Sequence, residues 1–99
     1  MQERLGIAVV PLTPQIAAQL GAAAGTQGVV IAEVDPNSDA ARKGLQRGDI
    51  VLTANYRAVP TVAALEAVVR QAQADGRDAV LLRLQRRGGP AQYLAVRLR

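Results

Sequence analysis

The stretch from residue 28 to residue 52, GVVIAEVDPNSDAARKGLQRGDIVL, constrains the fold of this chain more than any other part of it. It opens with β-branched residues, which favour a strand, and residues 35–37 then carry the side chains that favour a turn. Ser38 is suited to cap a helix, and Gly44 is suited to the left-handed position just past a helix end. The sequence therefore predicts a strand, a turn, a single short helix over residues 39–43, a second turn and a second strand.

Composition limits the chemistry that this chain can perform. Its 99 residues allow one hydrophobic core, and this core must be aliphatic because the chain has no Phe and no Trp. The absence of Cys and His removes thiol nucleophiles, imidazole bases and most transition-metal sites. The acidic residues form no spaced pair typical of acid–base catalysis or of a calcium loop, and Ser38 has no imidazole partner. We therefore predict no catalytic residue, no metal and no cofactor.

The charge of the chain narrows the classes of partner. A formal net charge of +4 suggests a polyanion, but the basic residues are spread along the chain and only two aromatic residues could stack on bases. No apolar run approaches the length of a membrane span. We therefore expect no nucleic-acid binding and no membrane insertion. Met1 is followed almost at once by sequence typical of a fold, so we expect an excised domain, with residues 1–4 as a lead-in and residues 5–99 as one domain.

The N-terminal segment contains one unusual glycine. Residues 5–10 are apolar and predict a strand that Pro11 ends, because proline lacks a backbone N–H. Gly6 lies within this strand, and a glycine there marks either a bulge or a place where another backbone comes close. Thr13 and Pro14 then predict the cap and the first position of a short helix, followed by a loop of small residues.

The longest predicted helix covers residues 62–74, with Thr61 as its cap. Two neighbouring apolar stripes run along it: Val62, Leu65, Val69 and Ala72, and beside them Ala64, Val68 and Gln71. This arc is wider than core packing needs, so either both stripes pack in the core or one of them faces a ligand. Strands at residues 79–86 and 92–98 follow, joined by a hairpin turn at residues 87–90, and their outer face is basic.

A set of positions in and just after the central stretch forms a longer pattern: Val34, Pro36, Ser38, Ala40, Ala41, Gly44, Leu45, Gly48, Asp49, Ile50, Leu52 and Asn55. This pattern resembles the central signature of PDZ domains, which are peptide-binding modules. The N-terminal phrase LGIAVVPLTP is similar to PDZ domains of bacterial HtrA, or Do-like, serine proteases, above all to their second, C-terminal PDZ domain. One departure is Tyr56, which follows Asn55 where the family has glycine and leaves the turn type open.

The resemblance implies a fold and a ligand site. The fold is α+β and mainly β: a partly open five- to six-stranded antiparallel β-barrel or sandwich capped by two or three helices. In PDZ domains an apolar–Gly–apolar loop binds the terminal carboxylate of a peptide through backbone N–H groups. The residues that match this loop are Arg4, Leu5, Gly6 and Ile7. The amides of Leu5, Gly6 and Ile7 would point at the carboxylate, and Arg4 would either add positive charge or stay solvated.

A bound peptide would then add as a strand beside Ile7, Ala8 and Val9, and the long helix would form the second wall of the groove. The wall residues that we expect are Ala64, Leu65, Val68 and Val69. The small side chains of Ala8 and Ala64 leave space, which favours an apolar C-terminal residue of moderate size.

The sequence therefore predicts a peptide-binding module that recognises C-terminal or extended apolar segments of unfolded proteins by β-strand addition. The resemblance implies a substrate-binding or regulatory domain of a periplasmic or cell-envelope HtrA-like serine endopeptidase, whose catalytic triad lies outside this chain. One alternative is a structural module that holds neighbouring domains or subunits of an oligomeric protease together. Another is the PDZ domain of a site-2 or C-terminal processing protease, or of a secretion component.

Overall fold

The computed structural model describes residues 2–86 and 89–99 of the chain. Its elements in chain order are α1 (Gln2–Leu5), β1 (Ile7–Pro11), α2 (Pro14–Gln19), β2 (Val29–Val34), α3 (Asp39–Arg42), β3 (Ile50–Ala54), β4 (Arg57–Ala58), α4 (Val62–Ala74), β5 (Ala79–Gln85) and β6 (Ala91–Arg97). The predicted central stretch is confirmed as β2, α3 and β3, and the predicted long helix is confirmed as α4. The predicted hairpin turn at residues 87–90 lies partly outside the described residues.

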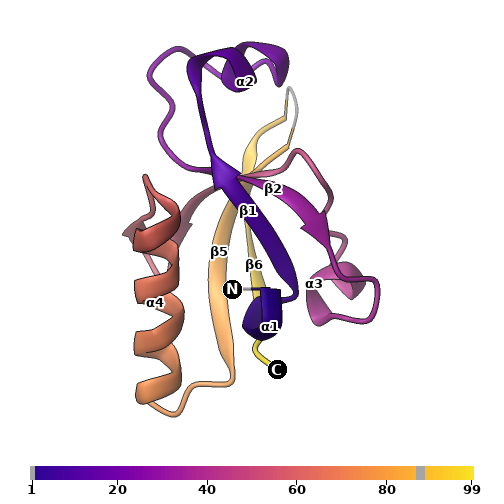
Figure 1. Cartoon of the computed structure of the whole chain (residues 1–99), viewed down its shortest axis with the longest axis vertical. Coiled ribbons are helices and arrows are strands. Elements are labelled where there is room, and N and C mark those ends of the chain that lie inside the picture. Colours follow the sequence, from indigo (N-terminus) through magenta and orange to yellow (C-terminus); the bar gives the residue numbers. More distant parts are fainter. Residues whose placement is uncertain (1, 87–88) are drawn as a thin grey trace.

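The strands form one six-stranded antiparallel sheet in the order β1-β2-β3-β5-β6, and the short β4 pairs with β3. Figure 1 shows α4 along one side of the sheet, α2 at one end of the molecule, and α1 beside the C-terminus. Within the described residues the sheet stays open, with β1 and β6 as its edges. The N–H of Arg99 donates to the carbonyl of Arg4 at 3.0 Å, which brings the two termini together. The α+β, mainly β and partly open architecture is confirmed.

The core is aliphatic, as composition requires. Its largest fully buried side chains come from α1, from the strands, from α4 and from the segment before α4: Leu5, Ile7, Ile31, Leu65, Leu82, Leu84, Val29, Val51, Val59, Val80 and Val96. Each such burial stabilises the fold by roughly 1.5–3 kcal/mol relative to an exposed side chain. Both tyrosines stay exposed at the surface.

Local turn and cap chemistry positions these elements. Ser38 Oγ caps α3 by accepting from the N–H of Ala41 at 3.2 Å, and Gly44 follows the helix with a φ of +85°. The carboxylate of the buried Asp49 closes the next turn by accepting from the N–H of Gln46 at 2.9 Å. These bonds satisfy backbone N–H groups at the start of the short helix and in the turn after it, which would otherwise lack a hydrogen-bond partner.

The predicted start of β1 is wrong. Leu5 ends the helical turn α1, and the strand begins at Ile7, because the φ of +77° at Gly6 breaks the extended backbone. The strand ends at Pro11, as predicted; Pro11 lies opposite Val29, and an edge strand tolerates it because one side of its backbone need not donate. The assignment of residues 1–4 to a lead-in stays a prediction.

The turn that the sequence left open has left-handed backbone at two successive residues. Asn55 has a φ of 50° and Tyr56 a φ of 65°, as in the turns that join tightly twisted hairpin strands. Asn55 stabilises the turn because its Oδ1 accepts from the N–H of Leu81 at 2.9 Å. Tyr56 therefore occupies a conformation that glycine adopts more easily.

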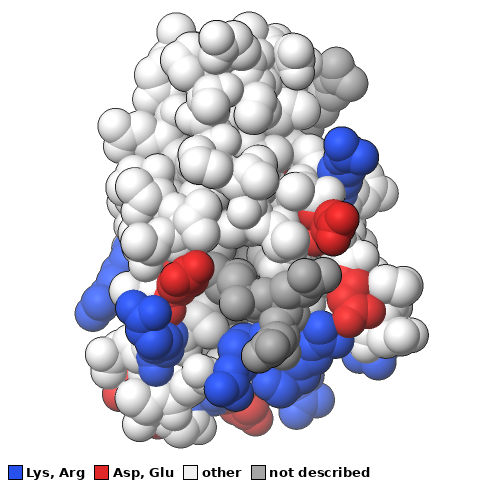
Figure 2. All heavy atoms as spheres, in the orientation of Figure 1, with Lys and Arg blue, Asp and Glu red and all other residues white. Residues whose placement is uncertain are grey.

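Charge is distributed unevenly over the surface. Residues 5–32 contain no charged side chain, and the end of the molecule that carries α2 is accordingly white in Figure 2. The basic and acidic side chains gather over the other half of the face shown. The N-terminal part of β1 and the C-terminal part of α4 lie in this charged half.

Candidate functional site

The two edges of the sheet differ in how they are protected. An unprotected edge strand presents backbone N–H and C=O groups to which another chain can pair. On β6 two of these groups are occupied by side chains of α3 and of Lys43, the residue just after it: Lys43 Nζ donates to the carbonyl of Ala95 at 2.9 Å, and the N–H of Arg97 donates to Asp39 Oδ2 at 2.9 Å. The edge of β6 is thus blocked by the helix of the central stretch.

The edge of β1 is open toward α4. In Figure 1, β2 lies on one side of β1 and α4 lies on the other, and no strand among the described residues pairs with the side that faces α4. The carbonyl of Gly6 accepts from the N–H of Asp35 at 2.8 Å, and Ile7 lies opposite Val34. Because this bond joins residues that flank the Ile7–Val34 pair, that pair exchanges no hydrogen bonds of its own. The N–H and C=O of Ile7 therefore point away from β2, toward the open edge.

Gly6 connects this edge to the central stretch. A Cβ atom added to Gly6 would lie 2.2 Å from Cβ of Ser38 and 2.7 Å from its Oγ, and the φ of +77° already disfavours other residues. The glycine is thus needed for packing against the cap of α3. The sequence did not show that this contact with Ser38 requires a glycine at position 6.

The side chains predicted to form the carboxylate loop lie in two environments. Leu5 and Ile7 are 1% and 0% exposed, so their side chains belong to the core and only their backbones remain to meet a ligand. Ala8 and Val9 are half-buried along β1. Arg4 is exposed, and its guanidinium lies against the side-chain amide of Gln73, with Nη1 and Nε 3.1 and 3.2 Å from the amide oxygen in the orientation that accepts both.

The contact between Arg4 and Gln73 shows which flank of α4 borders the start of β1. At 3.6 residues per turn, the residues that share this flank with Gln73 are Val62, Glu66 and Val69. Leu65 lies at the centre of the buried face, whereas Val68 lines a pocket on the opposite flank together with Gln71. The structure thus brings Leu65 and Val69 toward β1 and does not bring Ala64 and Val68 there. Helical periodicity had shown the two apolar stripes of α4, but it could not show which stripe lies toward β1 and which lies toward the opposite flank.

An ion pair lies beside the same end of β1. Arg99 Nη1 lies 2.8 Å from Asp35 Oδ2, and Asp35 Oδ1 accepts from the N–H of Asn37 at 2.9 Å. The bond from Asn37 and then the guanidinium of Arg99 hold the pKa of Asp35 below its ordinary value of 3.8. Arg99 follows the last strand, and no pattern in the sequence indicated this role.

Two kinds of feature are absent from the described residues. The part of the chain that the structure describes contains no group of three His, Cys, Asp or Glu residues able to hold a metal ion. In the same ranges, 2–86 and 89–99, no helix is long and apolar enough to cross a membrane.

Comparison with known families decides the identity of the fold. A family model described as "PDZ domain" matches residues 3–98. The chain belongs to the PDZ domain family. A solved structure titled as the HtrA3 PDZ domain bound to a phage-derived ligand, FGRWV, is similar with a TM-score of 0.78 and 26% identity, covering 97% of this chain and 85% of that one. The HtrA-type protease AlgW with a decapeptide gives a TM-score of 0.68 at 30% identity, covering 96% of this chain and 29% of that one.

Relatives with similar sequences are named as periplasmic proteases. A "Probable periplasmic serine endoprotease DegP-like" of Brucella suis is 42% identical over 59 residues, or 60% of this PDZ domain and 12% of that protein. A protein of the same name from Chlamydia pneumoniae is 30% identical over 95 residues, or 96% of this PDZ domain and 19% of that protein. The chain therefore spans a small part of these relatives, and their protease part lies outside the matched stretch.

Proposed function

We propose that this PDZ domain binds the C-terminal ends or extended apolar segments of other polypeptides by strand addition to β1. The observation that carries the proposal is the contrast between the two sheet edges. Asp39 and Lys43 occupy the backbone of β6, whereas the N–H and C=O of Ile7 on β1 face outward beside α4. A peptide that pairs with β1 gains main-chain hydrogen bonds, and α4 supplies side-chain contacts.

The carboxylate of a peptide C-terminus is proposed to lie at the start of β1. The amides of Leu5, Gly6 and Ile7 are the donors that the family resemblance assigns to it. A carboxylate that accepts from backbone N–H groups forms stronger bonds than a neutral acceptor does. Arg4 adds positive charge there, although its guanidinium already contacts Gln73.

The second wall of the proposed groove is the flank of α4 that contains Val62, Glu66, Val69 and Gln73. This set replaces Ala64 and Val68 of the sequence-based prediction and keeps Val69, with Leu65 beneath it. Val62 and Val69 are apolar, and Ala8 on β1 is small, so an apolar residue of moderate size is the end that we expect to fit. The HtrA3 ligand FGRWV also ends in an apolar residue, which supports this preference by analogy.

The same relatives suggest the protein from which this domain comes. Their printed names support a periplasmic or cell-envelope location and a parent that is an HtrA-like serine endopeptidase. In such a parent the domain would present substrate or regulate its cleavage. Its place as the second PDZ domain stays a prediction.

A titration of the isotope-labelled chain followed by NMR tests the proposal. The ligands are two pentapeptides that end in valine and differ only in a free or an amidated C-terminus. We expect amide shifts along residues 5–9 and on the Val62 flank of α4, and an affinity about tenfold or more weaker for the amidated peptide, because it lacks the charge-assisted bonds. Equal affinities would refute the carboxylate loop, and shifts along β6 in place of β1 would refute the open edge.

A further inference from the structure

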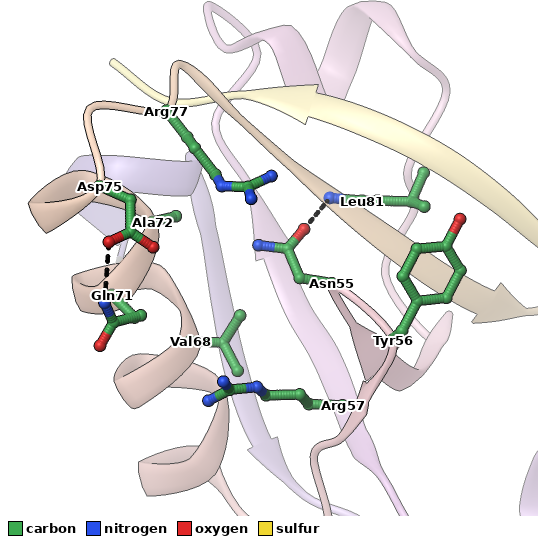
Figure 3. A pocket seen from close by; sticks show the side chains of 9 residues that line it. All are labelled: Asn55, Tyr56, Arg57, Val68, Gln71, Ala72, Asp75, Arg77 and Leu81. Carbon is green, nitrogen blue, oxygen red and sulfur yellow. Dashed lines mark hydrogen bonds between the residues drawn. The ribbon is translucent and has the colours of Figure 1, made fainter.

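A pocket of about 390 Å³ lies on the flank of α4 opposite to the proposed peptide groove. It is enclosed by α4, by the turn between β3 and β4, and by the start of β5 (Figure 3). The lining residues are Asn55, Tyr56, Arg57, Val68, Gln71, Ala72, Asp75, Arg77 and Leu81. None of them takes part in the proposed binding of a peptide to β1, so the pocket needs its own explanation.

Hydrogen-bond donors converge on this pocket from three elements. Figure 3 shows the guanidinium groups of Arg57 and Arg77 extending into it from opposite sides. Both arginines are exposed, and neither forms an ion pair with another described residue. Between them lies Asn55, whose Oδ1 already accepts from the N–H of Leu81, so its amide NH₂ remains as a donor that faces the pocket.

The acidic group in the lining is already engaged. Asp75 Oδ1 accepts from Gln71 Nε2 at 3.0 Å, which places this carboxylate against α4 and away from the two guanidinium groups in Figure 3. The lining therefore contains two cations without an ion-pair partner among the described residues, one carboxylate at its edge and the neutral donor of Asn55, a net charge of +1 that is suited to an anion of low charge.

The aromatic residues of the chain gather at the same place. The chain has only two, Tyr56 and Tyr93, and their ring centroids lie 5.8 Å apart. They are 77% and 50% exposed, although the core contains no aromatic residue and would gain from them. Tyrosine and arginine are the residue types that most often dominate protein interfaces. An exposed tyrosine in the lining, with a second tyrosine against it, and two arginines without an ion-pair partner among the described residues thus have the composition of a binding surface.

Tyr56 is also held in an unfavourable backbone conformation. Its φ of 65° is one that a bulky residue rarely adopts, and glycine would relieve the strain at this position. Strained and exposed residues of this kind concentrate where a ligand is bound. The strain at Tyr56 is therefore an observation independent of the arginines that indicates the same site.

We propose that this pocket binds an acidic segment of a polypeptide, with one Glu or Asp carboxylate seated between Arg57 and Arg77. The NH₂ of Asn55 donates to the same carboxylate, and Val68 and Ala72 of α4 pack against the aliphatic arm of the bound residue. A segment of protein fits better than a nucleic acid, because the lining mixes these apolar side chains and a carboxylate with the donors. The site lies on the other side of α4 from β1, so the domain can hold this segment and a β1 ligand together.

The test uses a hexapeptide that carries two glutamates and is acetylated and amidated at its ends. It has no terminal carboxylate, so its binding does not depend on the carboxylate loop at β1. We expect amide shifts at residues 55–57, 68–77 and 81, and an affinity about tenfold weaker for a matched peptide with glutamine in place of glutamate. Equal affinity for the two peptides, or shifts confined to β1 or to other basic side chains, would overturn the proposal.

Variants locate the site. The double substitution Arg57→Gln and Arg77→Gln is expected to weaken binding of the glutamate peptide about tenfold or more. Arg70→Gln on the outer face of α4 removes half as much charge and is expected to leave the affinity within about twofold. If Arg70→Gln weakens binding as much as the double substitution does, the attraction is general and the pocket is not the site.

The variant Tyr56→Gly tests the role of Tyr56 in binding without destabilising the fold. Glycine relieves the left-handed backbone, so the variant is expected to resist urea at least as well as the parent chain and still to bind the glutamate peptide several-fold more weakly. An unchanged affinity in this folded variant would show that Tyr56 takes no part in the site and would overturn the role given to the exposed aromatic pair.

Discussion

Gly6 packs directly against the side chain of Ser38, so that a single added methyl group would stand 2.2 Å from Ser38 Cβ. Ser38 has no freedom to move away. It is 2% exposed, and its Oγ donates to the carbonyl of Asp35 at 2.6 Å while it accepts from the N–H of Ala41. The strand that we propose for peptide binding and the helix that blocks the far edge are therefore joined through one contact.

Gly6→Ala is expected to lower the free energy of unfolding by about 2–4 kcal/mol, as the sum of left-handed strain and overpacking. Urea unfolding measures this loss. Gly76→Ala is the matched control, because Gly76 has a φ of +72° but nothing within 4 Å of its added Cβ, and only strain of about 1 kcal/mol applies. In a Ser38→Gly background the cost of Gly6→Ala should shrink, since the clashing atoms are gone. Equal costs for the two glycines would disprove the packing explanation.

The blocked edge of β6 leads to a second prediction. Asp39→Ala removes the acceptor for the N–H of Arg97, so the amide hydrogen of Arg97 should exchange faster and the chain should self-associate as its concentration rises. Hydrogen-exchange NMR and sedimentation measure the two effects. Arg42→Ala, on the same short helix, is the control and should change neither. A monomeric Asp39→Ala with unchanged exchange at Arg97 would show that α3 does not protect the edge.

Local signals in the sequence were sufficient to predict where α2, α3 and α4 begin. Thr13, Ser38 and Thr61 were each predicted as caps, and each accepts the backbone N–H three residues later. A cap depends on four consecutive residues, so no knowledge of the rest of the fold is needed. The same holds for Gly44, whose left-handed backbone follows from its place just past a helix.

The features that the sequence did not reveal depend on distant contacts. Asp39 and Arg97 are 58 positions apart, and nothing near either residue indicates that they meet. The helical turn α1 is too short to show periodicity, so residues 2–4 were predicted as part of a lead-in and Leu5 as the start of a strand. The stripes of α4 were visible, but assigning Val69 to one neighbour and Val68 to another required the order of strands in the sheet.

The Asp35–Arg99 pair predicts a dependence of stability on pH. The pKa of Asp35 is lower in the folded chain than its ordinary value of 3.8, so its contribution to stability is complete above that value and is lost as the pH falls through the lowered pKa. Urea unfolding at a series of pH values should show this acid loss in the parent chain, and Asp35→Asn should show less of it. A steeper acid loss in Asp35→Asn would contradict the assignment.

NMR titration of the Asp35 carboxyl group separates the two causes of its low pKa. Arg99→Gln should raise the pKa of Asp35 only part of the way, because the N–H of Asn37, which is the larger cause, still donates to it. Arg97→Gln removes a guanidinium that pairs with Asp78 at 4.0 Å and should leave the titration of Asp35 unchanged. A full return to the ordinary value in Arg99→Gln would assign the whole effect to the ion pair.

The flank of α4 that faces β1 contains one charge, Glu66, so it should influence which peptides bind there. Two peptides that end in valine and carry either lysine or glutamate near the middle should differ in affinity, with lysine preferred by about two- to fivefold through a partly exposed ion pair. Glu66→Lys should invert that ratio, measured by isothermal titration calorimetry. Arg70→Glu changes the charge by the same amount in the opposite direction on the outer face and should leave the ratio nearly as it was. If Arg70→Glu shifts the ratio in the opposite direction as far as Glu66→Lys shifts it, the effect comes from net charge, and Glu66 does not border the bound peptide.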